Sequence, residues 1–162
     1  MSTLVYPIFL HRMQGAQVVV VGGGKIGERK VEGLLAVGAQ VRLISPQATN
    51  TLQRMAGEGQ FEWIAHLYQP GDLAGALLAF AATDRREVNV QVASDAVDQH
   101  ILCNVADARE EGDFHVPALH RTDELTIAVG TNGTNPSLAK RVRTWIAEKM
   151  LGKQWPIVEE RS

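Results

Sequence analysis

Three glycines at G-x-G-x-x-G spacing are the first feature of this sequence that could bind a ligand. Gly22, Gly24 and Gly27 follow the apolar run 17–21 and open an amphipathic segment over 26–37. In this context the first glycine permits a tight turn, the second lets the backbone approach a pyrophosphate, and the third lets a helix pack closely on a strand. The pattern therefore predicts a dinucleotide site at a helix N-terminus. The simpler interpretation is a tight turn without a ligand.

Polar residues also follow two later apolar runs. Thr83 and Asp84 come directly after the run 77–82, and Asp107 comes shortly after the run 101–105. Ligands of open α/β sheets bind beyond the carboxyl ends of the strands, so we predict that these residues lie near the cofactor. Thr83 or Asp84 could equally cap the helix that follows. Asp107 could accept a proton or hold a metal ion, or it could be a turn residue bonded to its own backbone.

The acidic residue that usually binds the ribose of NAD is missing from the end of the second predicted strand. This strand covers 41–44 and is closed by Ser45 and Pro46, with Gln47 next. Arg42 lies inside the strand, and an arginine in this region could favour the 2′-phosphate of NADP. The residues alone therefore leave the choice between NAD and NADP open.

Predicted strands and predicted helices alternate regularly along the chain, and they position the residues named above. Short apolar runs at 17–21, 41–44, 61–65, 77–82 and 101–105 predict buried strands, and helices are predicted at 26–37, 49–57 and 84–99. This alternation predicts an α/β fold, a Rossmann-like doubly wound parallel sheet. We assign it to a domain over 1–112, followed by a small region over 113–162.

The second region combines one predicted strand and one predicted helix. The strand covers 125–129, and a polar loop leads to Pro136, which opens a helix to about residue 151 with Asn135 as its cap. We predict that Arg141 and Arg143 lie on a solvated face. The predicted apolar stripe comprises Leu138, Val142, Trp145, Ile146 and Met150.

Composition excludes several classes of protein. The 162 residues carry 16 Lys and Arg against 18 Asp and Glu, which argues against a nucleic-acid binder. Cys103 is the only cysteine, so an intrachain disulfide and a cysteine-based zinc cage are impossible. No run approaches the roughly 20 apolar residues of a membrane span, and the N-terminal segment is a poor signal peptide. We expect a cytoplasmic protein without membrane association.

Five segments together resemble the precorrin-2 dehydrogenase family, which includes the N-terminal part of sirohaem synthase. They are YPIFL at 6–10, VVVVGGGKIGERK at 18–30, AATDRREVN at 81–89, NVADAREEGDFHVPA at 104–118 and LTIAVGTNGTNPSLAKRVR at 125–143. Membership implies oxidation of precorrin-2 to sirohydrochlorin with NAD as hydride acceptor, in sirohaem biosynthesis. It also implies a homodimer, in which the region over 113–162 serves dimer formation and the substrate site.

The resemblance also assigns roles to individual residues. Asp107 matches the aspartate that the family links to catalysis. Cofactor contacts of relatives match Gly24, Lys25, Ile26, Pro46 and Gln47. The complete predicted cofactor set is Gly22, Gly24, Lys25, Ile26, Gly27, Ser45, Pro46, Gln47, Thr83 and Asp84. His115 and Thr131 are weaker substrate candidates, and no residue is predicted to ligate a resident metal ion.

The sequence departs from the family pattern in two places. The loop 131–135 carries Asn132 and Asn135 where relatives have Gly and Ser, and few residues follow 151 where relatives continue into a helical extension. Some relatives also insert ferrous iron, and the departures leave that activity open here. Two alternatives to a dehydrogenase also stay open: a non-catalytic module that binds NAD or a tetrapyrrole, and an S-adenosylmethionine methyltransferase.

Overall fold

The computed structural model describes residues 5–132 and 134–150, which belong to two compact units. One unit is Ile8–His115, and the other combines Met1–Pro7 with Val116–Ser162. The boundary predicted from the sequence lies after residue 112. In the described part of the chain, no helix is long and apolar enough to cross a membrane.

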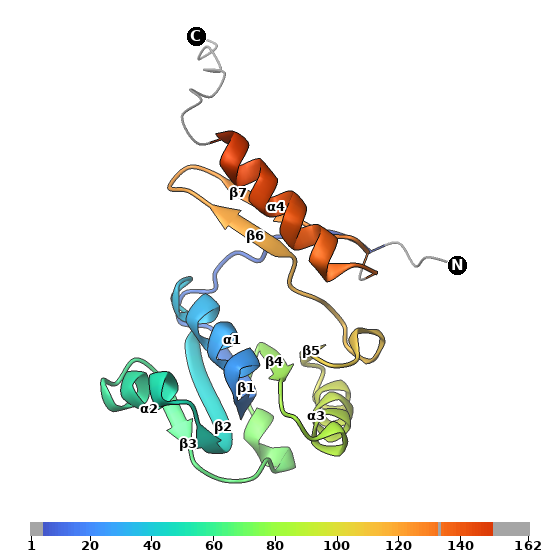
Figure 1. Cartoon of the computed structure of the whole chain (residues 1–162). Coiled ribbons are helices and arrows are strands. Elements are labelled where there is room, and N and C mark those ends of the chain that lie inside the picture. Colours follow the sequence, from blue (N-terminus) through green and yellow to red (C-terminus); the bar gives the residue numbers. More distant parts are fainter. Residues whose placement is uncertain (1–4, 133, 151–162) are drawn as a thin grey trace. The chain divides into compact units, whose positions relative to one another are not determined.

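The unit Ile8–His115 contains a five-stranded sheet in the order β3-β2-β1-β4-β5 (Figure 1). All neighbouring strands are parallel, and the order is that of a dinucleotide-binding Rossmann fold without its sixth strand. The predicted fold class is therefore confirmed. The strands are β1 (Gln17–Gly23), β2 (Gln40–Ala48), β3 (Glu62–Ile64), β4 (Leu78–Ala81) and β5 (Leu102–Val105).

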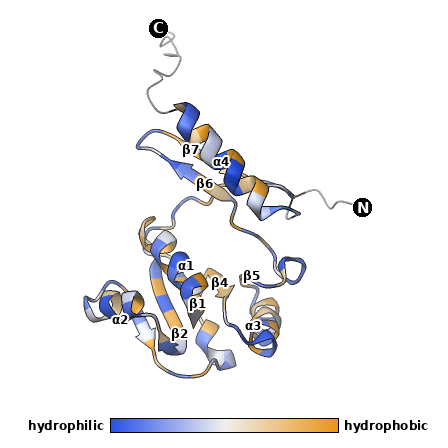
Figure 2. Ribbon diagram, viewed as in Figure 1, coloured by the Kyte–Doolittle hydropathy of each residue, from blue (hydrophilic) through white to orange (hydrophobic). Residues whose placement is uncertain are grey.

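Helices cover both faces of this sheet. On one face, α1 (Lys25–Leu35) and α2 (Asn50–Gly57) pack on side chains from β1 and β2. On the other face, α3 (Arg86–Asp98) and the 3₁₀ turn η1 (Pro70–Leu73) pack on the alternate side chains of β1 and on side chains of β4 and β5. Burial on both faces explains why β1 is a continuous run of valines. Figure 2 shows the hydropathy of the elements around it.

The segment after β5 runs beside the outer edge of that strand. The Asp113 N–H donates to the Cys103 carbonyl at 2.8 Å, and the Asp113 carboxylate accepts from the Cys103 N–H at 2.8 Å. The Asn104 amide donates to the Phe114 carbonyl at 2.8 Å. These bonds occupy the edge of β5, which would otherwise expose unpaired backbone groups. Cys103 is a buried core residue of β5, and burial raises the pKa of its thiol to about 11.

The second unit contains a two-stranded antiparallel sheet and one helix. β6 (Ala118–Arg121) pairs with β7 (Thr126–Val129), and α4 (Pro136–Met150) contacts both strands. β6 was not predicted, because its four residues show no strong alternation and the hairpin loop contains no glycine. The predicted cap is confirmed, since the Asn135 side chain accepts from the Leu138 N–H at 2.9 Å.

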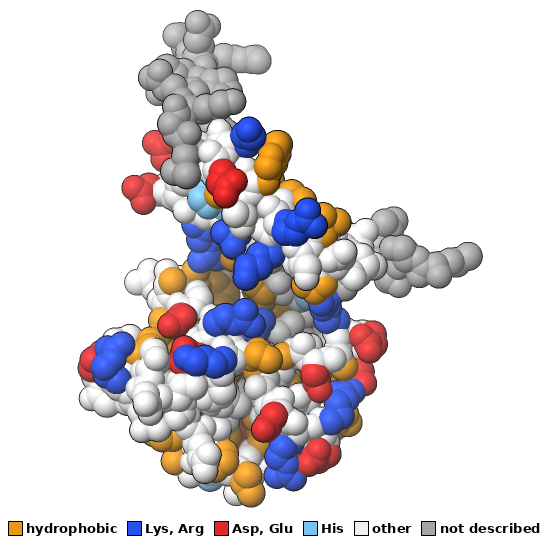
Figure 3. All heavy atoms as spheres, viewed as in Figure 1, with side chains coloured by type: hydrophobic (Ala, Val, Ile, Leu, Met, Phe, Trp, Pro, Cys, Tyr) orange, Lys and Arg blue, Asp and Glu red, His pale blue; other side chains and the backbone are white. Residues whose placement is uncertain are grey.

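The packing face of α4 differs from the predicted stripe. Ala139 is buried, whereas Leu138, Val142 and Trp145 are exposed, Trp145 by 59%. Arg143, predicted on a solvated face, is only partly exposed, and its Nε atom is buried without a hydrogen-bond partner among the described residues. Figure 3 shows hydrophobic side chains beside Lys and Arg side chains over this helix. The prediction was wrong for Leu138, Val142 and Trp145, whereas Ile146 and Met150 of the predicted stripe are partly buried.

Candidate functional site

The glycine loop at the end of β1 lies in close contact with the ends of β2 and β4. Gly22 has a φ of 117°, and a Cβ on it would lie 2.4 Å from the Ala82 carbonyl oxygen and 2.9 Å from the Thr83 nitrogen. A Cβ on Gly27 would lie 1.9 Å from the Gly22 carbonyl oxygen. No side chain larger than hydrogen fits at either position without backbone movement. The loop after β1 therefore lies directly against the loop after β4.

The N-terminus of α1 is open to a ligand. Gly24 is its N-cap residue, and no side chain caps the helix. A Cβ on Gly24 would have no neighbour within 4 Å, and Gly24, Lys25 and Ile26 are all exposed. The first N–H groups of a helix have no partner within the helix, and their positive end attracts phosphate. These residues fit the diphosphate of a dinucleotide.

The end of β2 lies over the same loop. β2 continues to Ala48 and does not end at Ile44 as predicted, because a register shift lets Ala48 pair with Gly23. The Ser45 hydroxyl accepts from the Gly23 N–H at 3.0 Å and donates to the Gln47 carbonyl at 2.6 Å. Pro46 and Gln47 are exposed beside the glycine loop. The structure thus brings the predicted residues 45–47 to the predicted glycine loop.

The buried carboxylate of Glu28 forms hydrogen bonds that stabilise the first turn of α1. Glu28 accepts from the Thr49 hydroxyl and from the Lys25 ammonium, the latter at 2.9 Å. Hydrogen bonds from Thr49 and Lys25 lower the pKa of Glu28 below its ordinary value. The Thr49 hydroxyl also accepts from the Leu52 N–H at the start of α2. These bonds tie the first turns of two helices to the end of β2.

Arg42 does not extend toward the end of its strand. Its Nε donates to Glu62 at 3.0 Å, and its NH1 donates to the Asp72 carbonyl at 3.4 Å. Arg42 is thereby engaged by the neighbouring strand β3 and by η1. No basic residue occurs over 45–49.

Thr83 is held by Asn89, which is fully buried in α3. The Asn89 Oδ1 accepts from the Thr83 N–H at 3.1 Å and from the Thr83 hydroxyl at 2.7 Å. The Asn89 Nδ2 donates to the Thr83 carbonyl at 3.1 Å. The alternative that Thr83 or Asp84 caps α3 is wrong, because Arg85 occupies the N-cap position.

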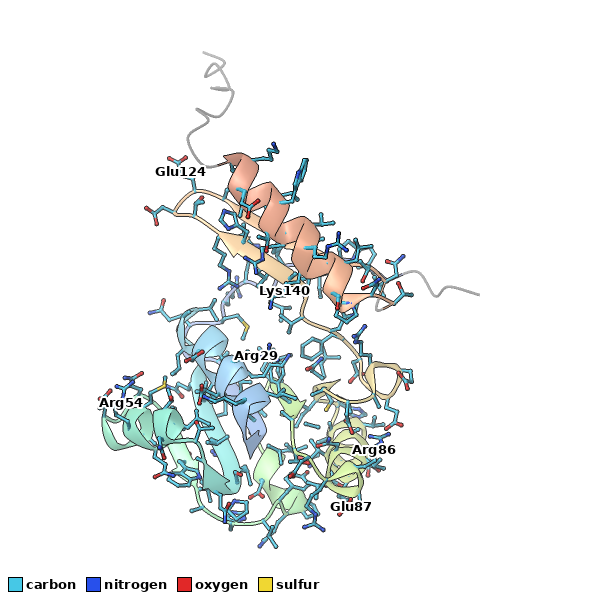
Figure 4. The ribbon with its side chains drawn as sticks, viewed as in Figure 1. Arg29, Arg54, Arg86, Glu87, Glu124 and Lys140 are labelled. Atoms are coloured by element: carbon cyan, nitrogen blue, oxygen red, sulfur yellow. The ribbon has the colours of Figure 1, made fainter. Side chains whose placement is uncertain are left out.

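The same asparagine reaches the predicted catalytic carboxylate. The Asn89 Nδ2 donates to Asp107 Oδ1 at 2.9 Å, and Arg86 NH1 lies 3.7 Å from that oxygen. Among the described residues, no group hydrogen-bonds to Asp107 Oδ2, and the carboxylate is 38% exposed. Arg86, labelled at the start of α3 in Figure 4, also donates to Glu111. Asp107 therefore has one fixed oxygen and one oxygen accessible to a ligand.

The weaker substrate candidates lie in different units. His115 is half-buried and ends the Rossmann unit. Thr131 belongs to the second unit, where its hydroxyl accepts from the Asn135 N–H at 3.1 Å and donates to the Asn135 carbonyl at 2.9 Å. In the described residues, no three His, Cys, Asp or Glu side chains gather in a way that could hold a metal ion.

Sequence reasoning missed Asn89 and Arg86. One signal pointed to Asn89, which shares the spacing of the apolar residues Val92 and Ala96 on α3. All three are fully buried. A polar residue on the buried stripe of a helix must find hydrogen-bond partners in the core, since an unpaired buried amide is costly.

Lys30 on α1 is a partly buried cation near β4. Its Nζ lies 5.2 Å from the centre of the Phe80 ring, and the Phe114 ring packs edge-on against Phe80. Burial, together with the smaller effect of the nearby charge of Arg29, lowers the pKa of Lys30 to about 8. The positive charge on Lys30 therefore lowers the free energy of unfolding, because burial disfavours the charged form.

This lowered pKa predicts a pH dependence of stability. Between about pH 8 and the ordinary lysine pKa of 10.5, the unfolded chain binds a proton that the folded chain lacks. The free energy of unfolding should therefore rise with pH across this window. In Lys30→Met the rise should be smaller, whereas the exposed control Lys140→Met should keep the wild-type slope. Urea unfolding between pH 7 and pH 10 measures this, and equal slopes in all three proteins would contradict it.

Comparisons with known proteins agree with this geometry. A family model described as "Putative NAD(P)-binding" matches residues 9–118. The siroheme synthase of Methylobacillus flagellatus is 41% identical over 146 residues, which are 90% of this chain and 31% of that protein. Siroheme synthase 3 of Aeromonas hydrophila is 38% identical over 85% of this chain and 29% of its own length. The chain thus spans about a third of these relatives.

A solved structure shows the same fold. The precorrin-2 dehydrogenase SirC superposes with a TM-score of 0.79 at 26% identity, covering 90% of this chain and 71% of SirC. The resemblance seen in the sequence is therefore confirmed by relatives and by a structure. With its family model spanning the sheet and the glycine loop, the chain belongs to the NAD(P)-binding family that this model describes.

Proposed function

We propose that this protein oxidises precorrin-2 to sirohydrochlorin with NAD. One observation carries the proposal: Asp107, with an accessible Oδ2, lies at the same sheet edge as an uncapped helix N-terminus that suits a diphosphate. The names of the relatives and of SirC support the choice of substrate.

In the proposed reaction, precorrin-2 loses two electrons and two protons. NAD accepts a hydride when it is bound. Asp107 takes the remaining proton through Oδ2, while Asn89 keeps Oδ1 in place. Gly24, Lys25 and Ile26 hold the diphosphate with their N–H groups, and Ser45, Pro46 and Gln47 form the wall beside the adenosine. The products are sirohydrochlorin, NADH and one proton.

NAD is favoured over NADP by the surroundings of Arg42. A 2′-phosphate needs a free basic group near the end of β2. Arg42 is engaged by Glu62 and by the Asp72 carbonyl, and the segment 45–49 has no basic residue. The proposed cofactor site also includes Gly22, Gly27, Thr83 and Asp84.

The region over 113–162 is proposed to serve substrate binding and a homodimer. His115 and Thr131 are its candidate substrate contacts, and ferrous iron is a candidate second substrate. Support for the homodimer comes from the exposed apolar side chains of Leu138, Val142 and Trp145 on α4, since exposed apolar clusters mark interaction sites.

Replacing Trp145 by Asp tests the homodimer. The wild-type chain should scatter light as a particle of twice 17.7 kDa, and Trp145→Asp should shift it toward the monomer. Thr144→Asp places the same charge on the neighbouring face of α4 and should leave the mass unchanged. A monomeric wild type at high concentration would remove this proposal.

The function itself is tested by a coupled assay with precorrin-2. We expect NADH and sirohydrochlorin to appear together in equal amounts with NAD, and much more slowly with NADP. Parallel reactions with and without ferrous iron report sirohaem formation separately from oxidation. NAD binding without turnover would overturn the proposal and favour a non-catalytic module. Binding of S-adenosylmethionine alone, measured by calorimetry, would favour a methyltransferase.

A further inference from the structure

Asn89 is the one buried side chain that the structure shows bonded to the loops after both β4 and β5. It has no exposed surface, and both the oxygen and the nitrogen of its amide form hydrogen bonds. Oδ1 accepts two hydrogen bonds from Thr83, and Nδ2 donates to the Thr83 carbonyl and to Asp107 Oδ1. An asparagine amide offers two donors and an acceptor with two lone pairs, so every bonding position is used.

We propose that Asn89 is a positioning residue, which couples the loop that carries Thr83 to the orientation of Asp107. The inference rests on the proposed function, because it assigns Asp107 to the reaction. Asn89 itself need not touch the substrate. It keeps Oδ1 occupied, so that Oδ2 is the oxygen left for the proton.

Asparagine suits this position better than other residue types of similar size. Leucine has nearly the same volume but would leave the Thr83 N–H, the Thr83 carbonyl and Asp107 Oδ1 without these partners. Aspartate keeps the acceptor for the Thr83 N–H and hydroxyl, but it replaces the amide that donates to the Thr83 carbonyl and to Asp107 by a second carboxylate oxygen. The two substitutions therefore separate the hydrogen bonds that Asn89 accepts from those that it donates.

Other charged groups lie near Asp107 or near Arg86, which faces it. Arg86 lies 3.7 Å from Oδ1 and also bonds to Glu111, and Glu110 contributes to the field at Arg86. Asp84, Arg85 and Glu87 lie on the same loop and first turn of α3, and Arg85 pairs with Glu87 at 2.7 Å. None of these groups is altered by a substitution at Asn89. A change in protonation at the site then reports on the Asn89–Asp107 bond.

The test is Asn89→Asp, measured as the pH profile of kcat. The introduced carboxylate and Asp107 repel each other, so the pair should hold a proton to higher pH and move the acid limb of the profile upward by about one pH unit or more. The Kd for NAD should stay within about threefold of wild type, because the bonds that Thr83 donates are kept. In Asn89→Leu, both kcat and NAD binding should fall.

A matched control exists on the same helix. Gln91 donates to Asp95 at 2.8 Å, so Gln91→Glu also replaces an amide beside an aspartate with a carboxylate. Asp95 bonds to Tyr68 and lies outside the proposed site. Gln91→Glu should lower stability without moving the pH profile. If Asn89→Asp keeps the wild-type profile, or shifts it no more than Gln91→Glu does, the inference is overturned.

A second readout separates this inference from the proposed function. The carboxyl carbon of Asp107 can be followed by NMR as pH changes, in the full chain without substrate. Its titration should move to higher pH in Asn89→Asp and stay in place in Gln91→Glu. A wild type that fails to oxidise precorrin-2 but shows this NMR shift would refute the proposed function and support the coupling. An unchanged titration in Asn89→Asp would refute the coupling whatever the activity.

Discussion

Asp107→Asn should reduce kcat for precorrin-2 oxidation by about 10²–10⁴, the range expected when a general base is removed. The substitution keeps the shape of the side chain, and its amide oxygen can still accept from Asn89 Nδ2. An amide cannot take up the proton that leaves the substrate. The Kd for NAD should therefore change little, so the loss appears in kcat at saturating cofactor. Stopped-flow detection of NADH together with calorimetry of NAD binding measures both quantities.

The control for this prediction is Asp98→Asn. Asp98 is an exposed aspartate at the last position of α3, and the same change of charge there should leave kcat unaltered. If Asp107→Asn keeps wild-type turnover, Asp107 has no role in proton transfer. An equal loss in both variants would show an effect of net charge.

Two glycines of the same fingerprint should respond to alanine in opposite ways. In Gly27→Ala the new methyl would lie 1.9 Å from the Gly22 carbonyl oxygen, so α1 must move away from β1. Overpacking of this kind costs about 1–3 kcal/mol of stability or more. In Gly24→Ala the methyl meets no protein atom within 4 Å, and stability should stay within about 0.5 kcal/mol of wild type. The methyl nevertheless occupies the space proposed for the diphosphate, so the Kd for NAD should rise at least about tenfold, or about 1.4 kcal/mol.

Gly33→Ala supplies the reference for these two variants. Gly33 lies within the same helix and also has open space around its Cα. Alanine there should raise stability by about 0.5–1 kcal/mol and leave NAD binding unchanged, since glycine weakens a helix interior. Urea denaturation of the three variants measures their stability, and calorimetry measures their affinity for NAD. Unchanged NAD affinity in Gly24→Ala would place the diphosphate elsewhere.

The hydrogen bonds of Asn89 connect the loop proposed to bind the cofactor with the carboxylate proposed to take the proton. Thr83 lies against Gly22 in the cofactor loop, and Asn89 connects it to Asp107. A shift in either loop must therefore break bonds of a buried amide. Such bonds are expensive to leave unmade, which favours one arrangement of the carboxylate relative to the loop after β4.

The sequence by itself determined the parallel sheet, its alternation with helices, and the glycine turn. These features arise from local patterns: continuous apolar runs predict strands buried on both faces, and G-x-G-x-x-G between a strand and a helix has a stereochemical basis. The start of α4 was also predictable, because Asn135 and Pro136 satisfy the first turn locally. The edge at which residues 45–47, 83 and 107 meet followed from the parallel direction of the strands.

Only the tertiary structure decided which side chains meet at that edge. The continuation of β2 to Ala48 depends on pairing with Gly23, and β6 depends on pairing with β7, so neither had a strong signal in its own residues. The packing face of α4 was decided by the hairpin beneath it. Asn89 and Asp107 are 18 positions apart in the sequence and share a hydrogen bond of 2.9 Å. Spacing predicts which face of a helix is buried, but the partner of a buried polar group depends on which strand ends the fold places beside it.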